Sequence, residues 1–529
     1  MRSTDSLLRS VSHFTLATLI SRVLGLVRDA CFGAFLSKQI ADAFWTGITI
    51  PSTFRMLFAE GALSAAFVPI LSRIRLEQGD DEAGRFARAV FNLMVLVVAA
   101  LVILAILTAP LYATALFHKW QATPERIALA TQMIQMMFPF LFFISLSAWA
   151  MGIQNAHGFF FLPAVSPAVY NAAVIGGALY GGLRLSGVRS AQAMALAVVV
   201  GGLLQFGIQL PAVRRLGCFP RRAIQLVHPE TRAFLLALGP TVFGLAIYQI
   251  NLIVNRLYFG SYLEPGSITS LTCAFRLLQF PQGVLGVAVA TAALPRLAEQ
   301  AAQCSTEAFC NTVVRSMKAL IFVLIPASIG LAVIGHDLVG IVYNRREFRI
   351  GELIQPTTSA LVAYAAGLFF FSAGKLLIQG FYAYREVKTP VKVGCLTMIV
   401  NIVCCRLLVY RLGVAGLALA STLASLVQVC VLFALLSPRL SGFPLRNLGV
   451  LILKVLICSG VMCLACLLIL RPFLVLGENS FGYGVRVLMG VSVGLLVYVG
   501  LAWLFLRHEV LSLLELRRTE EASSGEDSF

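Results

Sequence analysis

Apolar runs of about 20 residues recur along the whole chain, and this repetition constrains the fold more than any other feature. A helix needs about 20 apolar residues to cross the hydrocarbon core of a bilayer. Of the 529 residues, 59% are hydrophobic and only 12% are charged, against roughly 25% charged in an average soluble domain. There is too little polar surface to cover a soluble globule of this size. The sequence therefore predicts an all-α polytopic membrane protein.

Charged and turn residues divide the apolar runs into separate membrane spans. We predict about fourteen transmembrane helices, since each run is about one bilayer long. They cover residues 8–36, 41–72, 89–117, 127–153, 160–183, 190–213, 233–260, 267–295, 316–343, 355–383, 389–410, 412–437, 449–472 and 484–506. The spans at 41–72 and 267–295 are the least regular, because Arg55, Glu60 and Arg276 lie inside them.

The distribution of basic residues predicts the orientation of the chain. The net charge is +17, and in so apolar a chain we assign the basic excess to cytoplasmic loops rather than to nucleic acid. More than half of the 41 Lys and Arg residues fall in connections that face the cytoplasm if both termini are inside. Ser21-Arg22 interrupts the first apolar run, so we expect a retained helix and not a cleaved signal. Residues 511–529 have the composition of a disordered cytoplasmic tail.

A faint internal repeat indicates two similar halves. Val27–Gly33 aligns with Val254–Gly260, Pro167 with Pro390 and Gln205 with Gln428, at a nearly constant offset that fits six spans. Because six is even, the two copies have the same orientation and form a parallel repeat, an arrangement that places a substrate cavity between rocking lobes. We predict one six-helix lobe over 1–225, a second over 226–440, and two extra helices over 441–510.

Charged side chains inside the predicted spans mark the candidate site. A charge at mid-membrane costs about 2.5–3.5 kcal/mol on insertion scales, so such residues are expected to face a water-filled cavity or one another. Cations outnumber acids there: the cations are Arg22, Arg28, Arg55, Arg276 and Lys375, and the acids are Asp29, Asp42 and Glu60. The planar fork of Arg donates two parallel hydrogen bonds to one phosphate. Several arginines around one cavity thus favour a multiply charged anion such as pyrophosphate.

Helical spacing refines the placement of the first arginines. Arg22 and Asp29 share a helix face, whereas Arg28 is rotated by about 120° from Arg22. A bend at Gly25 would let both arginines point into one cavity. The structural alternative pairs Arg22 with Asp29, and Arg28 or Arg55 with Asp42 or Glu60, as salt bridges.

The second half supplies one further arginine. The repeat places Arg276 across the cavity from the other arginines, and Pro281 with Gly283 would loosen its helix as a gating element. Alternatively, Arg276 and Lys375 reach the membrane surface with their long side chains.

The remaining polar residues give weaker signals. Gln249, Asn251 and Asn255 either coordinate a coupling cation or hydrogen-bond neighbouring helices. The six His residues show no metal-ligand spacing. The Cys463–Cys466 pair has C-x-x-C spacing within an apolar helix, which favours packing over redox chemistry. The sequence contains no G-x-x-x-x-G-K-[ST] or H-E-x-x-H motif, so we expect neither a catalytic site nor a cofactor.

Several motifs resemble the MurJ/MviN family of lipid II flippases. They are Ser21-Arg22-Val23-Leu24-Gly25-Leu26-Val27-Arg28-Asp29, Asp42-Ala43-Phe44, Phe54-Arg55, Phe58 to Pro69, Phe280 to Ala288, Gly380 to Ala383 and Lys388-Thr389-Pro390-Val391. The resemblance implies a MATE-like fold of the multidrug/oligosaccharidyl-lipid/polysaccharide exporter superfamily, with the two extra helices forming a groove for a lipid tail. It also implies a bacterial cytoplasmic membrane protein that moves undecaprenyl-pyrophosphate-linked peptidoglycan precursor to the outer leaflet.

By motif position, the resemblance implies substrate-binding roles for Arg22, Arg28, Asp42, Arg55 and Arg276, and supporting or gating roles for Gly25, Asp29, Glu60, Gln279 and Pro281. Gln279 stands where the family has an acid. The expected energy source is the membrane potential or a monovalent cation, and the expected partners are lipid II, membrane lipids and the peptidoglycan synthesis machinery. The alternatives are a flippase for another polyprenyl-pyrophosphate glycan and, with less support from the cationic site, a MATE-type antiporter.

Overall fold

The computed structural model describes residues 20–57, 63–117, 119, 123–219, 228–344, 352–440, 442–507 and 509. These residues are helical apart from short connections, and no strand occurs among them. The chain divides into two compact units, of which unit 1 runs to Thr269 and unit 2 begins at Ser270. Glu60, one of the predicted supporting residues, and the predicted tail at 511–529 lie outside the described residues.

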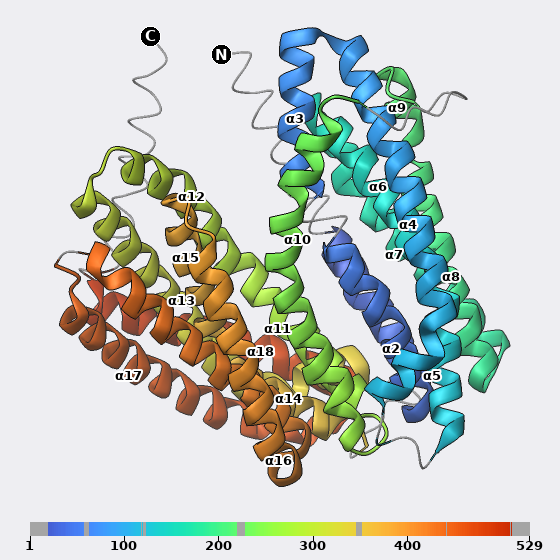
Figure 1. The fold of residues 1–529 in the computed structure, drawn as a ribbon. Coiled ribbons are helices and arrows are strands. Elements are labelled where there is room, and N and C mark those ends of the chain that lie inside the picture. The colour runs from blue at the N-terminus through green and yellow to red at the C-terminus, as the bar shows by residue number, and fades with distance from the viewer. Residues whose placement is uncertain are drawn as a thin grey trace. The chain divides into compact units, whose positions relative to one another are not determined.

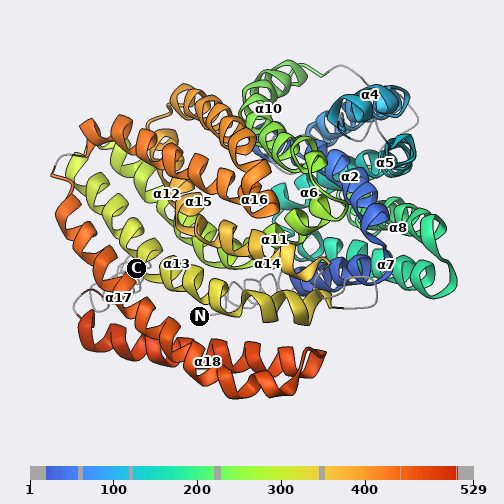
Figure 2. The same cartoon turned by 90° about the horizontal axis from the view of Figure 1, so that it is seen from below.

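Unit 1 is a bundle of helices around a buried aromatic core (Figures 1 and 2). Its helices are residues 20–35, α2 (Lys38–Arg55), α3 (Leu63–Gln78), α4 (Asp80–Leu116), α5 (Pro124–Met137), α6 (Pro139–Ala156), α7 (Phe161–Arg184), α8 (Gly187–Gly207), α9 (Leu210–Arg215), α10 (Thr231–Ile253), the π-helix η3 (Val254–Tyr258) and the short η4 (Gly260–Tyr262). Phe67, Phe86 and Phe234 bring α3, α4 and α10 together in one hydrophobic cluster.

An ion pair and a histidine–carboxylate contact also attach the residues just before α10 to α3 and α4. Arg73 lies 2.6 Å from Glu230, and His228 lies 3.1 Å from Glu82. α10 therefore packs with the helices that precede it, against α2, α3 and α4. The predicted repeat, with lobes at 1–225 and 226–440, stays a prediction.

Unit 2 is a second helical bundle built around α13. Its helices are α11 (Ser267–Pro281, whose first residues belong to unit 1), the π-helix η5 (Gln282–Gly286), α12 (Val287–Ala302), α13 (Thr306–Tyr343), α14 (Ile354–Ala365), α15 (Leu368–Ala383), α16 (Lys388–Leu436), the 3-10 turns η6 (Ser437–Arg439) and η7 (Arg471–Leu476), α17 (Leu445–Leu470) and α18 (Ser480–Phe505). α17 and α18 pair with each other and both pack on α13 (Figure 2).

The predicted spans coincide with these helices. Among the described residues, eight helices are long and apolar enough to cross a membrane, and the pair α14–α15, bent by 44°, adds a ninth. One of the eight, α16, is divided at Gly413, whose φ of 55° is not helical, and its two parts match the spans predicted at 389–410 and 412–437. The other predicted spans, 8–36, 41–72, 233–260 and 267–295, are helices that are interrupted or described only in part. An all-α polytopic membrane protein is thus confirmed.

Apolar side chains remain exposed where helices face outward. Leu104, Leu107 and Leu111 lie three and four residues apart along α4 and are 63%, 72% and 73% exposed. Such a stripe is expected where lipid rather than water surrounds a helix.

A buried arginine joins the last helices to α13 within unit 2. Arg486 on α18 donates from Nε to Asp337 Oδ1 at 2.7 Å and from Nη1 to the carbonyl oxygens of Gly477 and Phe473 at 3.0 and 3.3 Å. The guanidinium also lies over the Tyr483 ring, 5.0 Å from its centre. One side chain thus holds α18, η7 and α13 together.

We predict that Arg486→Ala lowers the unfolding temperature of the detergent-solubilised protein. Removing one partner of a buried pair leaves the other charge uncompensated and costs about 3–5 kcal/mol. The side chains of Arg486 and Asp337 are 3% and 13% exposed, so solvent screens them little. The exposed Arg471 supplies the control variant Arg471→Ala. Equal unfolding temperatures for the two variants would contradict the assignment, and replacing Arg486 and Asp337 together by Leu should recover most of the loss.

Candidate functional site

The predicted site residues lie on three helices. Arg22, Gly25, Arg28 and Asp29 lie on the helix over residues 20–35, and Asp42 and Arg55 lie on α2, all in unit 1. Arg276, Gln279 and Pro281 lie on α11 in unit 2.

Arg28 is held by its own neighbours. Its Nε and Nη2 donate to Asp29 Oδ1 at 2.9 and 2.7 Å, and its Nη1 donates to Asn171 Oδ1 on α7 at 2.9 Å. Tyr170 places its ring 5.7 Å from the guanidinium carbon. Asn171 in turn donates to the carbonyl oxygen of Ser21 at 3.0 Å. We call Arg28, Asp29, Tyr170 and Asn171 the Arg28 cluster.

The Arg28 cluster differs from the predicted pairing of Arg22 with Asp29. Helical spacing counts only the direction of each Cβ, but the long Arg28 side chain turns back to the carboxylate of the adjacent residue. Arg28 and Asp29 are 8% and 2% exposed, so each neutralises a charge that is costly to bury alone. The positive charge of Arg28 is thus largely balanced inside the cluster.

Arg22 is in a different environment. It is exposed, and it makes no hydrogen bond or ion pair with another described residue. Residues 20–35 are helical through Gly25 without interruption, and the helix turns Arg22 outward and Arg28 inward, as their rotation predicts. A Cβ at Gly25 would meet only Asn171 Nδ2, at 3.8 Å. The structure therefore does not bring Arg22 and Arg28 into one environment.

Asp42 accepts hydrogen bonds from the start of α11. The backbone N–H of Gly266 donates to Oδ2 at 2.7 Å, and the backbone N–H and hydroxyl of Thr269 donate to Oδ1 at 2.9 and 2.7 Å. A carboxylate at a helix N-terminus satisfies free N–H groups and is favoured by the helix dipole. Asp42 is 1% exposed. We call Asp42, Gly266 and Thr269 the Asp42 cap.

Arg126 is the cation beside the Asp42 cap. Its Nη2 lies 3.9 Å from Asp42 Oδ2, and its side chain is 15% exposed. The structural alternative expected Arg28 or Arg55 to pair with Asp42, and the structure places Arg126 of α5 there instead. Arg126 lies just before the span predicted at 127–153, so spacing within the first two helices could not find it.

Arg55 and Arg276 are half-buried, and Lys375 is exposed.

The predicted loosening of the helix after Arg276 is present as a change of helix type. α11 ends at Pro281, η5 makes a π-helical turn, and α12 follows. Such turns occur often at functional sites. A Cβ at Gly286 would lie 2.2 Å from the Ser372 hydroxyl oxygen on α15, so only glycine lets this turn approach α15 so closely.

Gln249 on α10 and Asn255 and Arg256 on η3 are buried, and Asn251 on α10 is half-buried. Gln249 donates to the Met56 sulfur at 3.0 Å, while Asn255 and Arg256 lie buried in η3. In the internal repeat, Arg256 occupies the position that corresponds to Asp29. Among the described residues no group of three His, Cys, Asp or Glu side chains could hold a metal ion. Cation coordination by Gln249, Asn251 and Asn255 stays a prediction.

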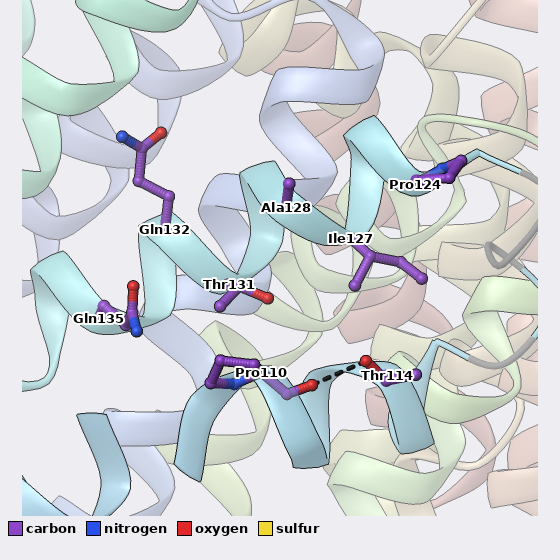
Figure 3. Close-up of a pocket in the computed structure, with 8 residues that line it drawn as sticks. All are labelled: Pro110, Thr114, Pro124, Ile127, Ala128, Thr131, Gln132 and Gln135. Carbon is purple, nitrogen blue, oxygen red and sulfur yellow. Dashed lines mark hydrogen bonds between the residues drawn. The ribbon is translucent and has the colours of Figure 1, made fainter. Parts of the chain in front are cut away.

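A groove of about 520 Å³ lies between α4 and α5 (Figure 3). Proline has no N–H, so Pro110 leaves the carbonyl of Ile106 without its helical donor, and Gln135 Nε2 donates to that oxygen at 3.1 Å. Thr114 donates to the Pro110 carbonyl oxygen at 2.7 Å. The lining residues carry no charge, so the groove offers an anion no counter-charge.

Comparisons with known proteins agree with this architecture. The family model described as "Lipid II flippase MurJ" matches residues 30–499. The probable lipid II flippase MurJ of Vibrio cholerae is 33% identical over 436 residues, which cover 81% of this chain and 82% of that protein.

Two solved structures also superpose on this chain. The structure titled "Lipid II flippase MurJ, inward closed conformation" superposes with a TM-score of 0.77 at 25% identity, covering 94% of this chain and 99% of that one. An inward-facing MATE family transporter of the MOP superfamily superposes with a TM-score of 0.67 at 14% identity, covering 80% of this chain and 95% of that one, and shows the shared fold.

We predict that Gly266→Ala weakens the Asp42 cap. Gly266 has a φ of +98°, and a side chain in such a left-handed conformation costs about 1–2 kcal/mol. Hydrogen exchange at the Thr269 amide should become faster than in the native protein. Gly460→Ala is the matched control, because a Cβ there meets nothing within 4 Å on a regular helix. The same exchange rate in both variants would show that the turn at Gly266 does not hold the cap.

Proposed function

The chain belongs to the family of MurJ lipid II flippases, and we propose that it carries lipid II from the inner to the outer leaflet of the cytoplasmic membrane by alternating access. The family match across residues 30–499 is the observation that carries the proposal. Lipid II is the undecaprenyl-pyrophosphate precursor of peptidoglycan, so this transport would supply cell wall synthesis outside the membrane. The work is transport and needs no catalytic group in this chain.

The pyrophosphate requires cations that its oxygens can reach. Arg22 is exposed and Arg55 and Arg276 are half-buried, and guanidinium groups bind phosphate with paired hydrogen bonds. We therefore propose Arg22, Arg55 and Arg276 as the ligands of the pyrophosphate. The buried Arg28 cluster holds the helix over residues 20–35 against α7 and so positions Arg22.

The Asp42 cap is proposed as the outer gate. In the predicted topology the connection before α2 faces outward, so Asp42 lies near the outer surface. Its bonds to Gly266 and Thr269 hold the start of α11 against α2 and keep this end closed. The break at Pro281 and η5 gives the span from α11 to α12 a place to bend when the cap opens.

The undecaprenyl tail is proposed to stay in lipid beside α17 and α18. Both helices expose large apolar side chains, such as Leu464 at 58% and Leu495 at 63%. The membrane potential supplies about 2.3 kcal/mol per elementary charge per 100 mV. That is enough to help return a cationic, unloaded carrier to its inward-open state.

We predict different consequences for the arginines in vesicles reconstituted with lipid II. Arg22→Ala, Arg55→Ala and Arg276→Ala should each lower the rate of lipid II translocation about tenfold or more, since each hydrogen bond to a charged group is worth about 1.5–3 kcal/mol. Arg28→Ala should lower the unfolding temperature, because it leaves Asp29 buried without its partner. The exposed Arg184 gives the control variant Arg184→Ala.

Translocation rates in the same vesicles also test the proposed anion site and the choice of substrate. Native translocation rates in all three arginine variants would refute the proposed anion site. If another undecaprenyl-pyrophosphate glycan moves as fast as lipid II, the broader flippase alternative holds instead.

A further inference from the structure

Both carboxylate oxygens of Asp42 accept hydrogen bonds. Three donor groups at the start of α11 supply these bonds: the backbone N–H of Gly266, and the backbone N–H and hydroxyl of Thr269. If the start of α11 moves away from α2, all three hydrogen bonds are lost together. The carboxylate, 1% exposed while the cap is closed, would then have lost all three donors, and that cost would oppose opening.

Arg126 lies close enough to Asp42 to replace the lost donors. Its Nη2 is 3.9 Å from Asp42 Oδ2, which is beyond hydrogen-bond distance but within reach of a small side-chain movement. It lies on α5, which packs along α2 in the same unit. When α11 moves, Arg126 therefore remains beside Asp42.

The direction of approach supports an exchange of partners. Arg126 faces Oδ2, the oxygen that receives a single hydrogen bond, from Gly266, while Oδ1 receives both donors of Thr269. Loss of the Gly266 bond frees the oxygen that Arg126 already faces. An Arg–carboxylate pair with two parallel bonds can then replace the lost donors.

We propose that Arg126 is a positioning residue that takes over Asp42 when the Asp42 cap opens, so that the carboxylate stays paired in both states. The interpretation of this motion as an outer gate rests on the proposed function; the exchange of partners does not. Arg126 stabilises the open state more than the closed one, because the ion pair that it already forms at 3.9 Å gains hydrogen bonds only after α11 has left. Removing it must therefore make the cap open less often.

This consequence separates the proposal from a purely structural role. If Arg126 only stabilised the closed arrangement, its loss would loosen the cap and speed hydrogen exchange at the amides of Gly266 and Thr269. The proposal requires the opposite change. These amides exchange only when their bonds to Asp42 break, so they report the open population directly.

The experiment is hydrogen exchange of the segment 264–272 in the full-length detergent-solubilised protein. Arg126→Gln should slow exchange at Gly266 and Thr269 about tenfold, since opening then leaves Asp42 without donors and without the Arg126 counter-charge. Arg126→Lys keeps the charge and should remain near the native rate. Glu125→Gln changes the exposed neighbouring residue and serves as the control.

Asp42→Asn completes the test as a double-mutant cycle. In the Asp42→Asn background, Arg126→Gln should have no further effect on the exchange rate, because no charge is left for Arg126 to pair. Faster or unchanged exchange in Arg126→Gln, or an equal slowing with and without the Asp42 charge, overturns the proposal. Arg126→Met provides a second neutral variant if the Gln variant does not fold. A failure of lipid II translocation leaves all of these rates untouched and refutes only the transport function.

Discussion

The structure depends on one constraint: a charge placed among apolar helices must have a partner, because the low dielectric makes an unpaired ion costly. Arg28 with Asp29, Arg486 with Asp337, and Asp42 with the start of α11 all satisfy it. Each pairing also fixes a helix contact, so the charges determine which helices stay together. A charge whose partners can be exchanged permits movement, whereas one enclosed by several partners does not.

The sequence was sufficient for the fold because span length and polarity are local properties. The division of α16 at Gly413 and the break of the eighth span after Pro281 both followed from residues visible in the chain. Pair formation was less predictable, since it depends on side-chain reach and on helices distant in sequence. Asn171, Arg126 and Asp337 carry no local pattern that identifies their partners. Spacing therefore predicted that the charges matter, whereas the structural alternative drawn from it paired Asp29 with Arg22 and the structure pairs it with Arg28.

The arginines separate into two kinds once their surroundings are known. Arg28 is enclosed by a carboxylate, an amide and an aromatic ring, and it behaves as part of the framework. Arg22 is exposed six residues away on the same helix, and its charge remains available to a ligand. In our proposal the framework pairs hold the helices rigid, Arg22, Arg55 and Arg276 bind the pyrophosphate, and the Asp42 cap controls access at one end.

The central claim is that Arg22, Arg55 and Arg276, and not Arg28, bind the pyrophosphate. An experimental structure of the protein with bound undecaprenyl pyrophosphate tests this most directly. We expect phosphate oxygens within hydrogen-bond distance of Arg22, Arg55 and Arg276, with the Arg28–Asp29 pair intact. A structure in which the phosphates instead displace Asp29 from Arg28, or lie away from Arg22, would contradict the account.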